Sequence, residues 1–336
     1  MSKFVKSAQI AVAAAITLSG VAHAQFQERA IRASLSLGKD HSLGQGLSKV
    51  VACAAQKTGG KMKITPYFDS QLGGDGPALQ QLRSGTLEMV VAATASTTSI
   101  LPAAGIFDLP FLIANEKEAD ALLDGKAGDL LASKMPAIGL VPLGYWEYGY
   151  RQTTNSKRPI TKVEDLQGVK MRVMPNPVMV DAFKNMGAVA LSMPLTDLYT
   201  AMETKAVDGQ ENPFSTIELN KFFEVQKYLS LTKHMYNPVI LFYSKQLFDK
   251  LTPQEQAVLK TCTTETRDEQ RRINRAQNLA SLAQLKEKGM QINEVPAAEL
   301  LRMREKMQPL YDKAAQTVGA DMMDVVNSEL KRIRTQ

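Results

Sequence analysis

The sequence predicts an α/β protein that folds as two lobes and carries one long helix bracing both of them. Segments with the two-residue period of strands alternate with helical segments along much of the chain, which is typical of a largely parallel sheet covered by helices. The chain has 336 residues, more than one hydrophobic core usually supports. Residues 252–288 contain almost no helix breaker, so a single helix there can contact both lobes.

The first 24 residues have the features of a secretory signal peptide. Two lysines precede an apolar run at residues 10–21, and the run ends in the small-residue site Ala22-His23-Ala24. The apolar run is shorter than the roughly 20 residues that cross a bilayer. We therefore expect cleavage after Ala24 and export of a mature chain of 312 residues (336 minus 24).

The segments that follow predict a first α/β unit. Glycines at positions 59, 60 and 85 mark the ends of its first two helices, because glycine is favoured just after a helix C-terminus. The predicted elements are, in order, a strand at 31–37, a helix at 42–57, a strand at 61–68, a helix at 79–84, a strand at 88–93, a helix at 115–134 and a strand at 140–146.

A second α/β unit is predicted from about Arg151. Thr252 and Pro253 supply the N-cap and first residue of the long helix, and Gly289 ends it. The chain shows no internal repeat and no flexible linker, so we expect strands that cross between the lobes to join them. The other predicted elements of this unit are a strand at 170–173, a helix at 178–186, a strand at 189–193 and a helix at 195–204.

Charge and composition argue against several kinds of partner and cofactor. The formal net charge is +6, or +4 without the two signal-peptide lysines, and the basic residues are interspersed with acids, so we predict no nucleic-acid surface. Three histidines, one of them in the signal peptide, are too few for a histidine zinc site, and we predict no metal and no cofactor. Cys53 and Cys262 lie far apart on predicted helices. We expect two separate buried thiols, although export would permit a disulfide.

Motifs of common enzyme classes are missing from the sequence, so we predict no enzyme and assign no catalytic residue. The segment Gly73-Gly74-Asp75-Gly76 lacks the lysine and the preceding buried strand of a phosphate-binding loop. We interpret it as the start of a helix with Pro77 as the first residue. Asp208 and Glu211 are close in sequence but have no neighbouring histidine, and we interpret each as structural.

Two arginines of the second unit are candidates for binding an anion. Arg172 ends an apolar-flanked strand, and Arg151 follows the aromatic segment Trp146-Glu147-Tyr148-Gly149-Tyr150. A guanidinium that enters a core must meet an anion, because it keeps its charge at neutral pH. The pattern alone leaves two interpretations open, a bound anion and a structural salt bridge to an internal acid.

Six segments of the chain together carry a resemblance to a known family. They are Gln71-Leu72-Gly73-Gly74, Asp108-Leu109-Pro110-Phe111-Leu112, Gly149-Tyr150-Arg151-Gln152-Thr153-Thr154-Asn155, Gly168-Val169-Lys170-Met171-Arg172-Val173, Val207-Asp208-Gly209-Gln210-Glu211-Asn212-Pro213 and Phe223-Glu224-Val225-Gln226-Lys227-Tyr228-Leu229. Each segment alone is weak, but the six occur in the expected order over essentially the whole mature chain. With them the sequence resembles the dicarboxylate-type (DctP-like) solute receptors of tripartite ATP-independent periplasmic (TRAP) transporters.

The resemblance implies a two-lobed periplasmic binding protein of the type II-like class. We expect residues 25–149 and about 238–278 to form lobe I. Residues 150–237 and about 279–336 are expected to form lobe II. The cleft between the lobes would hold the ligand, and the protein is expected to be a monomer in the periplasm.

The resemblance also implies a ligand-binding site. Arg172 matches the position that forms the main salt bridge to the ligand carboxylate. Arginine suits this role, because its planar guanidinium offers two parallel donors to a carboxylate. Arg151 and Asn212 match the positions that assist it. His41 falls where the opening loop of lobe I meets the ligand in such receptors, but a helix-capping role is equally open.

The segment from Thr94 to Thr98 is expected to face the cleft from lobe I. Members of the family that bind sialic acid carry charged residues in part of this stretch, whereas here the residues are small or hydroxylated. The segment therefore argues against sialate and favours a hydroxylated acid. Glu147 completes the predicted ligand-binding set.

The function implied is capture of a small organic acid anion by hinge closure, followed by delivery to TRAP membrane permease subunits driven by an ion gradient. Uronates and other sugar acids, dicarboxylates, 2-oxo acids and aromatic acids all carry the required carboxylate. One alternative is a periplasmic enzyme acting on an organic acid, with Glu147 or Asp208 as base. Another is a ligand-sensing module on the same fold for a membrane kinase.

Overall fold

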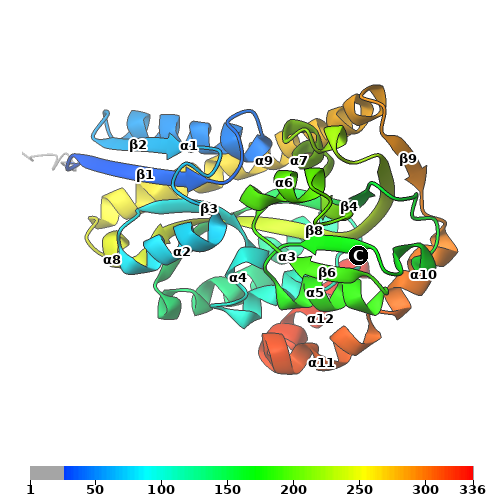
Figure 1. The fold of residues 1–336 in the computed structure, drawn as a ribbon. Coiled ribbons are helices and arrows are strands. Elements are labelled where there is room, and N and C mark those ends of the chain that lie inside the picture. Colours follow the sequence, from blue (N-terminus) through cyan, green and yellow to red (C-terminus); the bar gives the residue numbers. More distant parts are fainter. Residues whose placement is uncertain (1–25, 336) are drawn as a thin grey trace, which may run out of the picture.

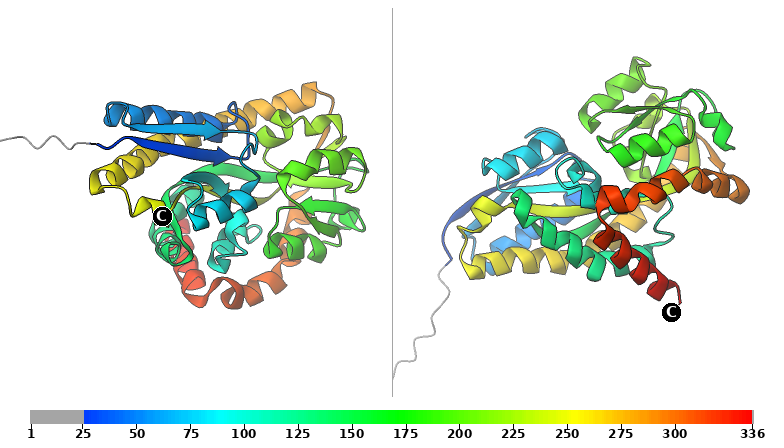
Figure 2. Two further views of the ribbon diagram at one scale, coloured as in Figure 1. Left: turned by 60° about the vertical axis from the view of Figure 1, so that its left-hand side comes forward. Right: turned by 90° about the horizontal axis from the view of Figure 1, so that it is seen from below.

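A single mixed sheet of nine strands runs through the molecule and is covered by helices (Figure 1). The computed structural model describes residues 26–335, so the predicted signal peptide and its cleavage site lie outside the described residues. The strand order is β2-β1-β3-β8-β4-β7-β5-β6, with β9 paired to β8. Figure 2 shows the two halves of the molecule, and the predicted α/β class with two lobes is confirmed.

Lobe I is built on three neighbouring parallel strands and two helices that the sequence predicts closely. Helix α1 has the predicted bounds, and Leu43, Leu47 and Val50 lie on its buried face. Helix α2 begins earlier than predicted, at Asp75, so Pro77 is its third residue and not its first. The elements are β1 (Arg29–Leu35), α1 (Ser42–Lys57), β2 (Met62–Tyr67), α2 (Asp75–Ser84), β3 (Met89–Ala93), η1 (Thr94–Thr97), η2 (Pro102–Asp108), α3 (Glu116–Leu123), α4 (Lys126–Lys134) and η3 (Pro136–Ile138).

The predicted helix at 115–134 is two helices. The first ends at Leu123, and Gly125 then caps the second in an extended conformation. A Cβ at Gly125 would lie 2.5 Å from the backbone oxygen of Ala121, so only glycine fits this tight connection. The break turns α4 so that it packs beside α12 (Ala320–Arg334).

Lobe II has three parallel strands that are shorter than those of lobe I. Strand β5 has the predicted bounds, and it pairs with β6 on one side and with the unpredicted β7 on the other. The elements are η4 (Val163–Leu166), β5 (Lys170–Val173), α5 (Pro177–Asn185), β6 (Val189–Ser192), η5 (Leu195–Asp197), α6 (Leu198–Glu203), β7 (Gly209–Asn212), α7 (Phe214–Leu219) and η6 (Phe222–Glu224).

Two long antiparallel strands join the lobes, β4 (Leu140–Asn155) and β8 (Tyr228–Ser244). Strand β8 pairs with β3 of lobe I, and β4 pairs with β7 of lobe II. The register of the β4–β8 pair shifts between Glu147 and Gly149. Gly149 has φ 108°, which disfavours any side chain, and a Cβ there would lie 3.1 Å from Asn274 Nδ2.

Helix α9 (Pro253–Glu287) is the predicted long helix, and it packs against α1, β4 and α7. It therefore contacts both lobes, as expected. Its start is a capping box, in which the Thr252 side chain accepts from the Glu255 N–H and the Glu255 carboxylate accepts from the Thr252 N–H. The remaining elements are α8 (Lys245–Phe248), β9 (Gln291–Glu294), α10 (Ala297–Glu305) and α11 (Gln308–Val318).

The prediction of two separate thiols is wrong, because Cys53 of α1 and Cys262 of α9 form a disulfide. Both residues do lie on helices, as expected. Helices α1 and α9 pack against each other, and this contact brings cysteines 209 positions apart in sequence side by side. Sequence separation was the wrong guide, since helix packing sets the distance between the sulfur atoms.

The C-terminal helices distribute their contacts over the molecule. Helix α10 packs against η4, whereas α11 packs against η2 and α5, and α12 packs against α3 and α4. The proposed lobe boundaries, which assign this whole segment to lobe II, stay a prediction. Within residues 26–335, no helix combines the length and the apolar character needed to cross a membrane.

Candidate ligand-binding site

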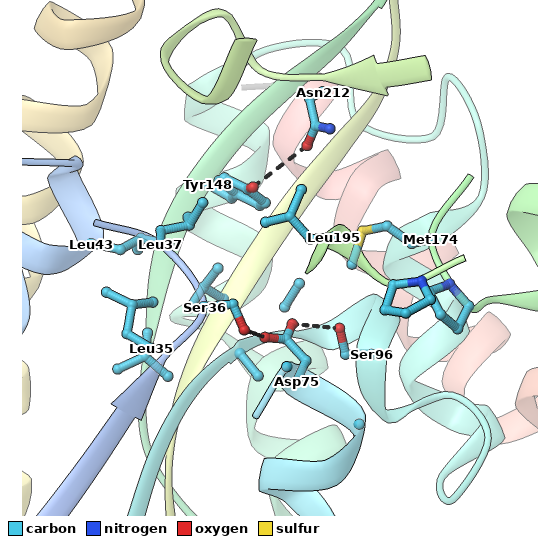
Figure 3. Close-up of a pocket in the computed structure, with 18 of the residues that line it drawn as sticks. Leu35, Ser36, Leu37, Leu43, Asp75, Ser96, Tyr148, Met174, Leu195 and Asn212 are labelled. Atoms are coloured by element: carbon cyan, nitrogen blue, oxygen red, sulfur yellow. Dashed lines mark hydrogen bonds between the residues drawn. The ribbon is translucent and has the colours of Figure 1, made fainter. Parts of the chain in front are cut away.

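A cavity of about 160 Å³ lies among residues contributed by both lobes (Figure 3). Most of its wall is apolar, and its polar groups are few. It is lined by Leu35, Ser36, Leu37, Leu43, Gly74, Asp75, Gly76, Val91, Ala92, Ala93, Ser96, Ser99, Tyr148, Arg172, Met174, Pro175, Pro194, Leu195, Asn212 and Val239. Of the six residues predicted to bind ligand, Arg172 and Asn212 line this cavity.

Arg172 is the basic residue of the cavity wall. Strand β5 holds it in the sheet with 2% exposure, and its Nε donates to the Met193 backbone oxygen at 2.9 Å. Its Nη1 is buried and has no hydrogen-bond partner among the described residues. Burial lowers the pKa of Arg172 to about 10, so the guanidinium still carries its charge at neutral pH. A buried donor without an acceptor is unfavourable, which is a reason to expect an anion beside it.

Arg151 lies next to this wall but is already neutralised. Its side chain is fully buried and forms an ion pair with Glu211 of β7, with Nη2 donating to Oε1 at 2.8 Å. Burial lowers the pKa of Arg151, but the charge and hydrogen bonds of Glu211 outweigh it and raise the pKa above its ordinary value. The same Nη2 donates to Asn212 Oδ1 at 3.1 Å. Arg151 therefore orients Asn212, and it does not line the cavity.

Asn212 and Tyr148 form the polar wall at one end of the cavity. The Tyr148 hydroxyl donates to Asn212 Oδ1 at 3.4 Å and accepts from Thr216 Oγ1 at 3.0 Å. Asn212 Nδ2 donates to Gln210 Oε1 at 2.6 Å. The amide is held from three sides, so its orientation is fixed before any ligand enters.

Asp75 is the acidic residue of the cavity wall, and the sequence interpretation missed it. It is the first residue of α2, and its two carboxylate oxygens accept from Ser36 Oγ and, at 2.7 Å, from Ser96 Oγ. Burial raises the pKa of Asp75, although the two serine hydroxyls and the charge of Arg172 oppose the shift. Figure 3 shows this group and the Tyr148–Asn212 pair at opposite ends of the drawn side chains.

The other three predicted site residues have contacts outside the cavity wall. His41 caps α1: its Nδ1 accepts from the Leu43 N–H at 3.2 Å, so its Nε2 carries the proton and faces Ser215 Oγ at 3.2 Å. Burial lowers the pKa of His41 to about 3. Thr94 is fully buried at the start of η1, and its hydroxyl is 3.5 Å from the Pro238 oxygen.

Glu147 is an internal partner of α9. Its carboxylate accepts from Arg275 Nη2 at 2.7 Å and from Asn274 Nδ2 at 2.9 Å. Asp208, the alternative base, accepts from the Lys170 N–H at 3.0 Å and helps to close the turn before β7. Neither carboxylate lines the cavity. Over the part of the chain that the structure describes, no cluster of three or more histidine, cysteine or acidic side chains could hold a metal ion.

Chemically, the cavity presents a guanidinium whose Nη1 has no partner among the described residues, one carboxylate and a fixed amide between apolar walls. This arrangement matches the general pattern of a small-molecule site, in which a few placed polar groups orient a ligand against apolar surface.

Comparison with known proteins gives a match to the bacterial extracellular solute-binding proteins of family 7 (DctP) over residues 33–317. The chain belongs to this family. Its predicted kinship with the solute receptors of TRAP transporters is thereby confirmed. The family consists of solute-binding proteins. The prediction that the chain is not an enzyme agrees with this description of the family.

Two solved structures and one curated sequence represent its relatives. The sugar acid binding protein DctPAm from Advenella mimigardefordensis, in complex with galactonate, is 39% identical with a TM-score of 0.90, over 92% of this chain and 99% of that one. A TRAP periplasmic solute binding protein from Sulfurospirillum deleyianum with bound succinate is 27% identical with a TM-score of 0.85, over 90% and 99%. The 2,3-diketo-L-gulonate-binding periplasmic protein YiaO of Escherichia coli is 35% identical over 70% of this chain and 72% of its own.

Two polar residues of the lobe I wall, Asp75 and Ser36, were missed by the sequence interpretation. Asp75 was assigned to the start of a helix, which is correct, but nothing in the sequence shows that this helix start faces Arg172. Ser96 lies in the segment from Thr94 to Thr98 that was expected to face the cleft, and it lines the cavity. Ser36 follows β1, and the carboxyl ends of parallel strands are where α/β proteins bind ligands, which was the signal available for this serine.

Proposed function

We propose that this DctP-family receptor binds a small organic acid in the cavity between its lobes, with Arg172 as the residue that pairs with the ligand carboxylate. The observation that carries the proposal is the buried Nη1 of Arg172, which has no partner among the described residues. A carboxylate at this position would satisfy the donor and the charge together. Truncating one member of such a pair typically costs about 2 to 5 kcal/mol.

Asn212 and Arg151 support this site in different ways. Asn212 presents an oriented amide to the cavity, and Arg151 holds that amide in place at 3.1 Å while Glu211 balances its charge. The other three predicted site residues have contacts that support structural roles. His41 caps a helix, Thr94 is a buried turn residue, and Glu147 is a partner of α9. We propose that these three act on the ligand only through the fold.

Closure of the lobes around the ligand is the proposed mechanism. Asn176, which caps α5 in lobe II, donates to Asp108 Oδ2 at 2.6 Å and reaches the Ala95 oxygen of lobe I at 3.4 Å. Contacts of this kind exist only when the lobes are together. A ligand that touches both walls of the cavity favours the closed form, because binding shifts an equilibrium only through differential affinity.

Membership of the family supports a proposal for the compartment and the partner. We propose a periplasmic receptor whose signal peptide is cleaved after Ala24 and which delivers its ligand to TRAP permease subunits. The names of its relatives, which include a TRAP periplasmic solute binding protein and a diketogulonate-binding periplasmic protein, support this assignment. N-terminal sequencing of protein from the periplasm is expected to start at Gln25.

A thermal-shift screen followed by calorimetry tests the function. Galactonate, erythronate, glucuronate, succinate, orotate and neutral galactose are to be added to the purified mature protein. A ligand at 100 times its Kd stabilises the native state by about 2.7 kcal/mol, which is a readily measured shift of Tm. We expect at least one acid to bind with a Kd in the micromolar range or tighter, and galactose to have no effect. Binding of galactose and of none of the acids would contradict the proposal.

A further inference from the structure

We propose that Asp75, held by Ser36 and Ser96, is the specificity-determining residue of the cavity: it accepts hydrogen bonds from ligand hydroxyl groups and excludes acids with a second carboxylate. The inference rests on the proposed function and extends it, because it names the ligand class as polyhydroxylated monocarboxylates. Nothing in the family match assigns a role to this residue.

The position of Asp75 is the first step of the argument. It belongs to lobe I and Arg172 belongs to lobe II, and both line the same cavity. They are near enough for each charge to influence the pKa of the other. No ion pair within 4.0 Å joins them in the described structure, so neither residue neutralises the other by direct contact.

The hydrogen bonds of Asp75 define what it can accept. Ser36 Oγ donates to Oδ1 and Ser96 Oγ donates to Oδ2, so both oxygens act as acceptors, as in an ionised carboxylate. An ionised carboxylate has about four acceptor sites. Two serine donors leave capacity for further donors, and ligand hydroxyls are the neutral groups that supply them.

The charges explain why a second carboxylate is excluded. Arg172 and Asp75 sum to zero in the empty cavity. A monocarboxylate brings one negative charge, which pairs with Arg172 and leaves hydroxyls for Asp75. A dicarboxylate brings a second charge towards Asp75, and like charges in a buried site are strongly unfavourable. The serines cannot relieve this, since their hydroxyl protons already point at Asp75.

Three four-carbon acids separate these effects. Erythronate has one carboxylate and three hydroxyls, succinate has two carboxylates, and butyrate has one carboxylate and no hydroxyl. Calorimetry with the wild-type protein is expected to give a Kd for erythronate at least tenfold below those of succinate and butyrate. Galactonate extends the series to six carbons in case the cavity requires a longer chain.

The decisive variant is Asp75→Asn, which keeps size and removes the charge. Loss of a hydrogen bond to a charged group should weaken erythronate or galactonate roughly 10- to 100-fold. Succinate should bind as well as before or better, so the preference ratio falls at least tenfold. Asp181→Asn is the matched control, because it is the same substitution at an exposed aspartate of α5 that does not line the cavity. Its ratio should stay within twofold of wild type.

The outcomes distinguish the inference from the function on which it rests. Wild-type protein that binds none of the four acids contradicts the sugar-acid assignment and the cavity role together. Wild-type protein that binds succinate at least as tightly as both hydroxy acids overturns the inference but leaves the receptor function standing. That second result needs no variant, so the inference remains testable if Asp75→Asn does not fold. An unchanged ratio in folded Asp75→Asn also overturns it.

Discussion

Arg151 and Glu211 form a fully buried ion pair directly behind the cavity wall, with Arg151 Nη2 donating both to Glu211 Oε1 at 2.8 Å and to Asn212 Oδ1 at 3.1 Å. Glu211 also lies 3.4 Å from His234 Nε2. Burial raises the pKa of Glu211, but the charge of Arg151 and the hydrogen bonds from His234 and Arg151 together outweigh it and lower the pKa. The two arginines of the site therefore differ in charge balance. Arg151 is neutralised by Glu211, whereas Arg172 forms no ion pair among the described residues.

Removal of only one partner of the Arg151–Glu211 pair should destabilise the fold strongly. Arg151→Met leaves Glu211 buried without its counter-ion, which typically costs about 3 to 5 kcal/mol. The double variant Arg151→Met/Glu211→Leu should cost clearly less than the sum of the single variants, because no charge is left unpaired. Urea unfolding of the four proteins measures the cycle.

A surface pair is the matched control for that cycle. Arg302 donates to Glu299 at 2.9 Å with 45% of its side chain exposed. Arg302→Met should change the free energy of unfolding by about 1 kcal/mol or less. Equal costs for Arg151→Met and Arg302→Met would show that burial does not set the energy of the Arg151 pair.

Removal of the disulfide should reduce stability but leave ligand affinity unchanged. The bond closes a chain segment of 209 positions, and loss of a native disulfide typically costs about 2 to 5 kcal/mol. Neither cysteine lines the cavity, so Cys53→Ala/Cys262→Ala should bind ligand within threefold of wild type. Thiol titration of denatured wild-type protein should find no free cysteine. Two free thiols, or a tenfold loss of affinity, would contradict this prediction.

Much of the fold could be predicted because local patterns set it. Helix α1 and strand β5 have their predicted bounds, and the capping residues Thr252 and Pro253 locate the start of α9. Strand β4 was predicted only to Trp146, because polar residues and Gly149 interrupt its apolar run. Those residues are buried by β7, β8 and α9, and a single strand's sequence does not contain that information.

The site shows the same division. Arg172 could be predicted, since a buried arginine requires an anion whichever segments of the chain surround it. Asp75, Ser36 and the partner of Cys53 could not, because each depends on which segments become neighbours in space. Glu147 had the chemistry of a site residue, but Arg275 of α9, more than a hundred residues away, already satisfies it.

Asp108 should make the stability depend on pH. Burial raises its pKa from 3.8 to about 7, although the hydrogen bond from Asn176 and the charge of Arg151 oppose the shift. Between these values the native state holds a proton that the unfolded chain has lost, so the free energy of unfolding falls as pH rises. The slope reaches about 1.4 kcal/mol per pH unit.

Asp108→Asn isolates this contribution. The variant keeps an oxygen for the Asn176 amide and does not titrate. The difference in unfolding free energy, variant minus wild type, should rise by about 2 to 3 kcal/mol from pH 5 to pH 8. Other titrating groups such as His41 are present in both proteins and cancel in this difference. Urea unfolding at several pH values measures it, and a difference independent of pH would contradict the assignment.

Arg172 should carry the ligand carboxylate, and its variants test charge and geometry separately. Arg172→Ala is expected to weaken binding of the cognate acid roughly 30-fold to a few thousand-fold, because removing one partner of a buried charge pair costs about 2 to 5 kcal/mol. Arg172→Lys keeps the charge but loses both the two-pronged geometry and the Nε bond to Met193, so its affinity should lie between those of wild type and Ala. Arg172→Ala also removes a buried unpaired donor, so the unliganded variant should be at least as stable as wild type. Calorimetry gives the affinities and urea unfolding gives the stabilities. A folded Arg172→Ala protein that binds like wild type would place the ligand carboxylate elsewhere, whereas a variant that loses both stability and binding would identify Arg172 as a structural residue.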